Sequence, residues 1–118
     1  MSMSADLHEL TRKILEFRDA RNWKQFHNPK DMALSLTLEA AELLEHFQWK
    51  NGQELDRHVS ENRMAIGEEL ADVLYWVLLM SKDINVDIVG AFENKMKKNA
   101  EKYPIEKARN SKEKYSEL

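Results

Sequence analysis

The feature that most constrains this sequence is the spacing of its apolar residues, which follows the period of an α-helix along most of the chain. Leu7, Leu10, Ile14 and Phe17 recur every three or four positions, so they share one face of a helix over about residues 6–21. The same reasoning predicts three further helices, over about 28–51, 53–83 and 85–103. Alternation of the strand type is nowhere sustained, so the sequence predicts an all-α fold.

Cap and turn residues mark the ends of these helices. Asp6 resembles an N-cap, and Asn28 before Pro29 combines a cap residue with a proline at the first helical position. Asn51-Gly52 is a turn signal that ends the second helix. The third segment is compatible with a break before Asn62, and Pro104 ends the fourth.

The chain of 118 residues has the length of one domain, and its three Gly and two Pro leave room for long helices. Residues 1–104 are therefore expected to form one domain of the four-helix-bundle type. Residues 105–118 are expected to form a polar, basic and irregular tail, because residues 95–118 carry eight Lys or Arg against four Glu.

Composition excludes several classes of function. The net charge of -3 gives no overall basic field for nucleic acid, and the absence of Cys excludes disulfides and a Cys nucleophile. The longest apolar stretch, residues 70–80, is too short to span a bilayer and contains Asp72. Residues 1–10 lack the apolar region of a secretory signal. We therefore expect a cytoplasmic protein without a membrane or nucleic-acid partner.

Two acidic pairs are the strongest candidates for chemistry. Glu39 and Glu42 lie one turn apart on the second predicted helix, and Glu69 and Asp72 do so on the third. Acids three positions apart occur five times in the sequence, and random placement gives about four, so the spacing alone carries little weight. These two pairs differ from the others because they border the apolar stripes of the two most apolar helices.

If the two helices pack antiparallel, the four carboxylates converge at a partly buried seam. Burial and like-charge repulsion oppose such an arrangement, and a divalent cation would relieve both. Hard carboxylate oxygens favour Mg²⁺, with Mn²⁺ as an alternative. The competing interpretation is a pair of solvated helix edges. A di-iron bundle would need Glu-x-x-His on two helices, which the sequence lacks; His46 is expected at the helix surface or behind the ligands.

The motif Glu39-x-x-Glu42 followed by Glu69-x-x-Asp72 resembles the metal motif of the MazG-like, all-α nucleoside triphosphate pyrophosphohydrolases. Further segments resemble the dCTP pyrophosphatase branch of that family: residues 23–29, residues 47–49, Lys95-Met96 with Asn99, Tyr103-Pro104, Ala108-Arg109 and Lys114-Tyr115. They cover nearly the whole chain in order. Asn110 stands where a glycine would be usual.

The resemblance implies a role for each group of candidate residues. Glu39, Glu42, Glu69 and Asp72 would bind Mg²⁺, and Glu39 or Glu68 would orient the water that attacks the α-phosphorus. The implied phosphate-binding residues are Lys95, Asn99, Lys102, Tyr103 and Arg109. Cations near the end of a helix are also favoured by its dipole alone.

By the same resemblance, four residues at the two ends of the second helix would enclose the base: Trp23, Phe26, His27 and Trp49. Aromatic residues at helix ends also serve as packing residues, and Tyr75 and Trp76 are expected to do so. Gly67 lies mid-helix beside the acids, where it costs about 1 kcal/mol relative to Ala. A close approach of another helix is one explanation, and tolerated strain is the other.

Residues 70–80 are apolar nearly all round the helix, which predicts an oligomer because one layer of helices would leave part of this surface wet. The resemblance implies a homotetramer built as a dimer of dimers. It implies hydrolysis of dCTP or modified dCTP to the monophosphate and pyrophosphate, as house-cleaning of the nucleotide pool. A dUTP or broader NTP range stays open, and the alternative is a non-enzymatic helical module that binds a partner.

Overall fold

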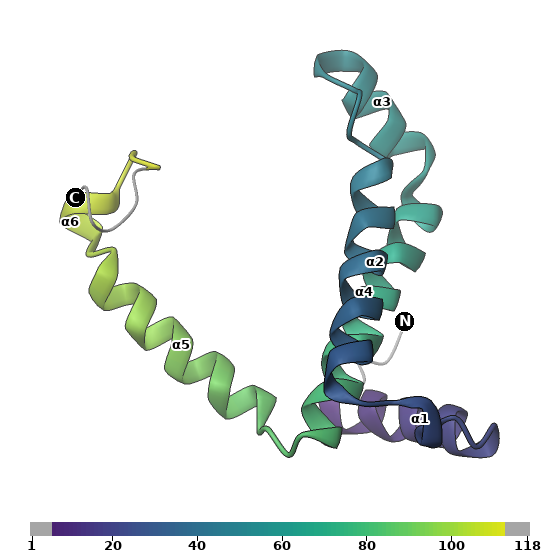
Figure 1. Cartoon of the computed structure of the whole chain (residues 1–118). Helices are drawn as coiled ribbons and strands as arrows, with labels where there is room; N and C mark the ends of the chain where they lie inside the picture. The colour runs from purple at the N-terminus through teal and green to yellow at the C-terminus, as the bar shows by residue number, and fades with distance from the viewer. Residues whose placement is uncertain (1–5, 113–118) are drawn as a thin grey trace. The chain divides into compact units, whose positions relative to one another are not determined.

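The computed structural model describes residues 6–112 and is built from helices (Figure 1). In chain order they are α1 (Leu7–Ala20), the short 3₁₀ helix η1 (Lys24–Phe26), α2 (Pro29–Glu45), α3 (Gly52–Glu61), α4 (Arg63–Asp83), α5 (Ile88–Lys102) and α6 (Ile105–Ala108). Residues 6–112 contain no strand, so the all-α prediction is confirmed. Residues 1–5 and 113–118, which include the N-terminal segment and the end of the expected tail with Lys114-Tyr115, lie outside the described residues.

The helices begin at the residues that the sequence marks as caps. The Asp6 carboxylate accepts a hydrogen bond of 2.9 Å from the backbone N–H of Glu9 at the start of α1. The Asn28 side chain accepts one of 2.8 Å from the backbone N–H of Asp31, and Pro29 occupies the first position of α2. These bonds satisfy N–H groups that have no partner within the helix.

Asparagine in the left-handed conformation follows three helices. Asn22, Asn85 and Asn110 have φ angles of 55°, 64° and 65°, a region that favours glycine first and asparagine next. Asn22 follows α1, Asn85 follows α4, and Asn110 follows α6. Asn110 therefore satisfies the backbone conformation for which a glycine would be usual.

The expected third helix is two helices, because the chain breaks at Asn62. Asn62 has φ -126° and ψ 28° between α3 and α4, and its side-chain amide donates to the carbonyl oxygen of His58 at 2.9 Å. The break falls where the sequence allowed one. A second difference concerns the tail, because residues 105–108 form the short helix α6 rather than irregular chain.

The chain divides into two compact units, residues 1–85 and residues 86–118. In the first, α2 and α4 pack along each other, and α4 also contacts α1 and α3 (Figure 1). Among residues 6–85 the buried apolar side chains are few: Met32, Ile66, Leu78 and Leu79. The second unit contains α5 and α6. Among the described helices, none has the length and apolar composition needed to cross a bilayer.

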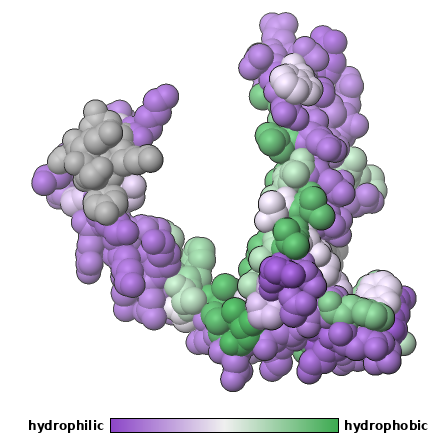
Figure 2. Space-filling model, in the orientation of Figure 1, coloured by the Kyte–Doolittle hydropathy of each residue, from purple (hydrophilic) through white to green (hydrophobic). Residues whose placement is uncertain are grey.

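The first unit leaves several large apolar side chains exposed. On α2 they are Leu34, Leu38 and Leu44, and on α4 they are Met64, Leu70 and Leu74. Figure 2 shows hydrophobic side chains among hydrophilic ones over the part of the surface formed by α2 and α4. Exposed apolar area of this kind typically marks an interaction surface.

Candidate functional site

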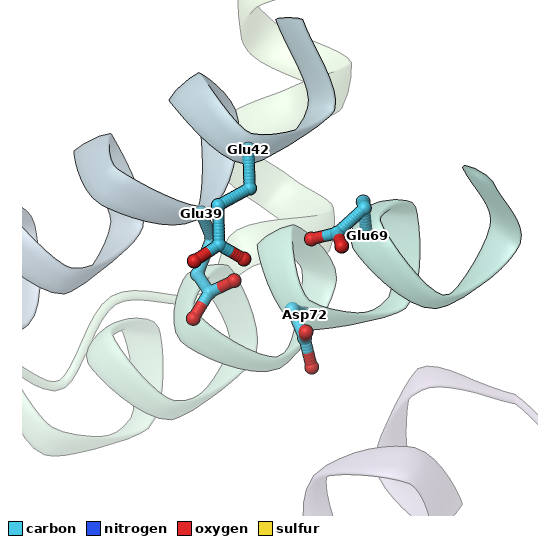
Figure 3. Close-up of side chains that lie close together, drawn as sticks. All are labelled: Glu39, Glu42, Glu69 and Asp72. Carbon is cyan, nitrogen blue, oxygen red and sulfur yellow. The ribbon is translucent and has the colours of Figure 1, made fainter. Parts of the chain in front are cut away.

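The packing of α2 against α4 brings together the four carboxylates that the sequence singles out. Glu39 and Glu42 project from α2, and Glu69 and Asp72 project from α4 (Figure 3). One carboxylate oxygen from each lies within 4.8 Å of those from the other three. A spacing of three residues places both acids of a pair on the same side of their helix, so each helix contributes one pair to this carboxylate cluster.

Burial differs within the carboxylate cluster. Glu39 and Glu69 are half-buried, whereas Glu42 and Asp72 are exposed. The Oε2 atoms of Glu39 and Glu69 are buried, and they have no hydrogen-bond partner within the described part of the chain. A buried carboxylate oxygen without a donor is costly, so these two atoms would be stabilised by a proton or by a ligand that donates or carries positive charge.

The pKa values of the two half-buried carboxyl groups, Glu39 and Glu69, are also raised. Burial, followed by the closeness and charge of the Glu42 carboxyl, raises the pKa of Glu39 from 4.5 to about 7. Burial and the Glu42 carboxyl likewise raise the pKa of Glu69. The positive charge of His46 partly offsets this rise. Both shifts mean that the folded chain resists full ionisation of the cluster.

The donor set fits a hard divalent cation. It consists of carboxylate oxygens from two rigid helices, with two exposed members through which water and substrate oxygens can reach a bound ion. Mg²⁺ and Mn²⁺ take such ligands, and Mg²⁺ keeps part of its coordination shell for water and phosphate. Glu68, the other candidate for orienting water, is exposed on α4 and lies outside the cluster.

Gly67 does not mark a close approach of helices. Apart from its chain neighbours and the backbone of its own helix, no described heavy atom lies within 4 Å of the position that a Cβ at Gly67 would occupy. Of the two explanations for Gly67, a close approach of another helix is therefore not found within the described residues.

The sequence did not predict a pair of histidines that joins the end of α2 to α3. His46 Nδ1 and His58 Nε2 lie 3.0 Å apart, and the side-chain amide of Asn62 lies 3.2 Å from His58 Nδ1. Burial, then the positive charges of Lys50 and His46, lower the pKa of His58. No spacing signal links these residues, because they come together through the turn between two helices.

The candidate base-binding residues lie in different surroundings. His27 is half-buried, and its ring meets Trp76 edge to face at a centroid distance of 5.4 Å. Trp23 meets Phe17 in the same way at 5.7 Å. Phe26 and Trp49 are far more exposed, at 67% and 83%. The structure therefore builds His27 and Trp23 into aromatic contacts and leaves the other two open.

Arg18 is the most unexpected residue of the first unit, because it is charged and only 2% exposed. Its Nη1 donates to Asp83 Oδ2 at 2.6 Å and lies 3.5 Å from His27 Nδ1. The hydrogen bond from Arg18 to Asp83 is the main cause that raises the pKa of Arg18. In the sequence Arg18 lies between Glu16 and Asp19 on an apparently polar face, and its partner follows 65 residues later.

The candidate phosphate-binding residues belong to the second unit. Lys95, Asn99 and Lys102 are separated by four and three positions on α5, so they share one face of that helix. Tyr103 follows as the C-cap residue, with its backbone N–H bonded to the carbonyl of Asn99 at 2.9 Å. Arg109 follows α6 as its C-cap residue.

Known proteins resemble this chain over most of its length. The model of the MazG-like family matches residues 34–118. dCTP pyrophosphatase 1 of Rattus norvegicus is 37% identical over 114 residues, which cover 95% of this chain and 67% of that protein. dCTP pyrophosphatase 1 of Homo sapiens is 39% identical with the same coverage.

A solved structure agrees with these matches. A pyrophosphatase from Archaeoglobus fulgidus superposes with a TM-score of 0.79 at 35% identity, and the match covers 88% of this chain and 97% of that one. The resemblance inferred from the acidic motif is thus confirmed in family and in fold. The chain belongs to the MazG-like family, close to its dCTP pyrophosphatase members.

Proposed function

We propose that this protein is a Mg²⁺-dependent enzyme that hydrolyses dCTP or modified dCTP to the monophosphate and pyrophosphate. Nucleoside triphosphate pyrophosphohydrolysis is the reaction of the dCTP pyrophosphatases to which the chain is similar over most of its length. The single observation that carries the proposal is the carboxylate cluster, with its two buried oxygens that have no hydrogen-bond partner within residues 6–112.

The carboxylates have two tasks in this reaction, which are to hold the metal ion and to activate the attacking water. Glu39, Glu42, Glu69 and Asp72 hold the ion. When bound there, Mg²⁺ (or Mn²⁺) supplies a Lewis acid that neutralises triphosphate charge and polarises the α-phosphorus. Glu39 or Glu68 orients the attacking water and accepts its proton. The new bond joins the water oxygen to the α-phosphorus, and the bond to the bridging oxygen breaks, so pyrophosphate leaves with the electron pair.

The remaining candidates bind the two ends of the substrate. Lys95, Asn99, Lys102, Tyr103 and Arg109 offer cationic, amide and hydroxyl groups for phosphate oxygens. Trp23, Phe26, His27 and Trp49 offer ring faces and edges for the base. In this proposal residues 1–104 form the catalytic domain, and the basic tail over residues 105–118 contributes to phosphate binding.

Assembly is part of the proposal, because the first unit buries few large apolar side chains and exposes many. We propose a homotetramer built as a dimer of dimers, in which subunits cover the exposed leucines of α2 and α4 and share active sites. The absence of Cys is compatible with a reducing compartment such as the cytoplasm.

The deciding experiment measures pyrophosphate release from a panel of dNTPs and NTPs with Mg²⁺, beside an EDTA sample. Glu39→Gln is the test variant, and Glu45→Gln is the matched control because Glu45 is exposed at the end of α2 and lies outside the cluster. We expect rapid release from dCTP that EDTA and Glu39→Gln abolish and Glu45→Gln preserves.

Other outcomes separate the alternatives. Release from a different nucleotide keeps the reaction and overturns the assignment to dCTP. If a folded sample releases pyrophosphate from none of them, and Mg²⁺ with nucleotide does not raise its Tm, the protein is a partner-binding module instead.

A further inference from the structure

The buried side chain of Arg18 lies 3.6 Å, at Nε, from Oδ1 of the neighbouring Asp19, and it faces two partners from more distant parts of the first unit. One is Asp83 at the end of α4, to which Arg18 Nη1 donates at 2.6 Å. The other is His27, whose Nδ1 lies 3.5 Å from the same nitrogen of Arg18. The Arg18–Asp83 pair therefore reaches one of the residues proposed to contact the base.

The chemistry of the guanidinium determines what His27 can be. All guanidinium nitrogens of Arg18 are donors, and none can accept a hydrogen bond. If Nδ1 of His27 carried a hydrogen, its N–H would face the N–H groups of the positively charged Arg18 guanidinium. The contact is therefore compatible with an imidazole that is unprotonated at Nδ1 and carries its hydrogen on Nε2.

The other groups around His27 do not reverse this preference. Trp76, from α4, covers the ring edge to face and carries no charge. Asp83 attracts a proton toward His27, but its carboxylate is already bonded to Arg18. Burial first, and the charge of Arg18 second, lower the pKa of His27, and Asp83 only partly offsets them.

We propose that Arg18, held by Asp83, is a positioning residue that keeps His27 neutral with its hydrogen on Nε2, so that His27 donates to an acceptor atom on the substrate base. Cytosine offers such acceptors at its carbonyl oxygen and its unprotonated ring nitrogen. The second half of this proposal rests on the proposed function, because it requires a nucleotide base at His27.

The first test concerns the unliganded wild-type protein and needs no substrate. ¹⁵N NMR of the imidazole rings reports which nitrogen carries hydrogen, and His27→Gln assigns the signals of His27. We expect an unprotonated Nδ1 and a protonated Nε2, with a titration midpoint below the ordinary 6.5. A hydrogen on Nδ1, or a midpoint at or above 6.5, would overturn the role of Arg18.

The dependence on Arg18 is tested in the same spectra. Arg18→Met removes the positive charge and should move the His27 midpoint upward, whereas Arg18→Lys keeps the charge and should hold the midpoint below 6.5. An unchanged midpoint in a folded Arg18→Met variant contradicts the proposal. If Arg18→Met does not fold, the wild-type spectrum and Arg18→Lys still decide it.

The second test concerns the base and uses a non-hydrolysable dCTP analogue in Mg²⁺. In the His27→Gln variant the side-chain amide nitrogen takes the position of Nε2 and can still donate to the base. In the His27→Asn variant it takes the position of Nδ1 instead. We expect His27→Gln to keep the Kd within a few-fold and His27→Asn to raise it by about tenfold, because the base acceptor then loses its donor.

The outcomes of the two tests are distinguishable. Equal affinity of both His27 variants, with the expected NMR result, overturns the base contact and leaves the positioning of His27 by Arg18 intact. Absence of nucleotide binding in wild-type protein overturns the proposed function and the base contact together. The NMR result then still decides the state of His27.

Discussion

Helix α4 contributes to two separate groups of partly buried charged side chains, and the charges in these groups are compensated to different degrees. The Arg18–Asp83 pair joins opposite charges at 2.6 Å, with side-chain exposures of only 2% and 13%. The carboxylate cluster joins four like charges, two of which are half-buried and keep an oxygen without a hydrogen-bond partner in the described chain.

Both groups contain a residue with a raised pKa, but the two shifts have opposite effects on the charge. Asp83 raises the pKa of Arg18, which favours its charged form. Burial and Glu42 raise the pKa of Glu39 to about 7, which disfavours its charged form. A compensated pair therefore belongs to the scaffold, whereas uncompensated charge in a rigid setting indicates a site for a ligand of opposite charge.

The largest effect on stability is expected from breaking the compensated pair. Arg18→Met leaves the nearly buried Asp83 carboxylate without its partner, which should lower the free energy of unfolding by about 3–5 kcal/mol. Urea unfolding at fixed protein concentration measures the change. The double variant Arg18→Met with Asp83→Leu should recover most of the loss, and a single variant as stable as wild type would contradict the assignment.

For the carboxylate cluster, a rise in pH should lower the stability of the folded protein, and Mg²⁺ should raise it. Because the pKa of Glu39 rises from 4.5 to about 7 on folding, the folded state binds this proton more tightly than the unfolded state. Without metal, its contribution to stability is therefore present below about pH 4.5 and is lost as pH rises through about 7. Mg²⁺ at 100 times its Kd should restore about 2.7 kcal/mol at pH 8.

Thermal unfolding from pH 5 to pH 8, with and without Mg²⁺, measures this response. The ion should stabilise the protein more at pH 8 than at pH 5, because it competes with protons for the carboxylates. Glu39→Gln should flatten the pH dependence and weaken the effect of Mg²⁺. A Mg²⁺ effect that is independent of pH would contradict binding at the cluster.

A smaller effect is expected at Gly67, which lies on α4 beside the cluster but adds no charge to it. Since no described atom of another helix or side chain outside its immediate neighbours lies within 4 Å of the added Cβ, Gly67→Ala should stabilise the helix by about 1 kcal/mol. Urea unfolding checks the sign. Destabilisation would mean that another subunit packs against this face of α4, which size-exclusion chromatography of the variant would then reveal.

The smallest effect is expected at an exposed ion pair on the same helix as Arg18. Arg12 donates to Glu16 at 2.8 Å, with both side chains at least 60% exposed. Water and salt screen such a pair, so Arg12→Ala should cost only about 0.3–0.5 kcal/mol. Because it removes an arginine from α1 without touching the interior, it is the matched control for Arg18→Met.

The sequence predicted the carboxylate cluster well and missed the Arg18–Asp83 pair, for one physical reason. Glu39 with Glu42, and Glu69 with Asp72, are local pairs whose place on a helix follows from its period. Arg18 and Asp83 lie 65 residues apart, and no local period relates them. In the sequence Arg18 therefore resembles a solvated residue between two acids. The structure buries it, because α1 packs on α4.

The sequence by itself determined the helices, most of their ends and the family, because caps, breaks and apolar stripes act within a few residues. The tertiary structure alone decided which turn of α2 meets which turn of α4, and hence that four carboxylate oxygens lie within 4.8 Å of one another. It also decided that Arg18 is buried against Asp83 and His27. Those contacts depend on how whole helices pack, which local spacing does not encode.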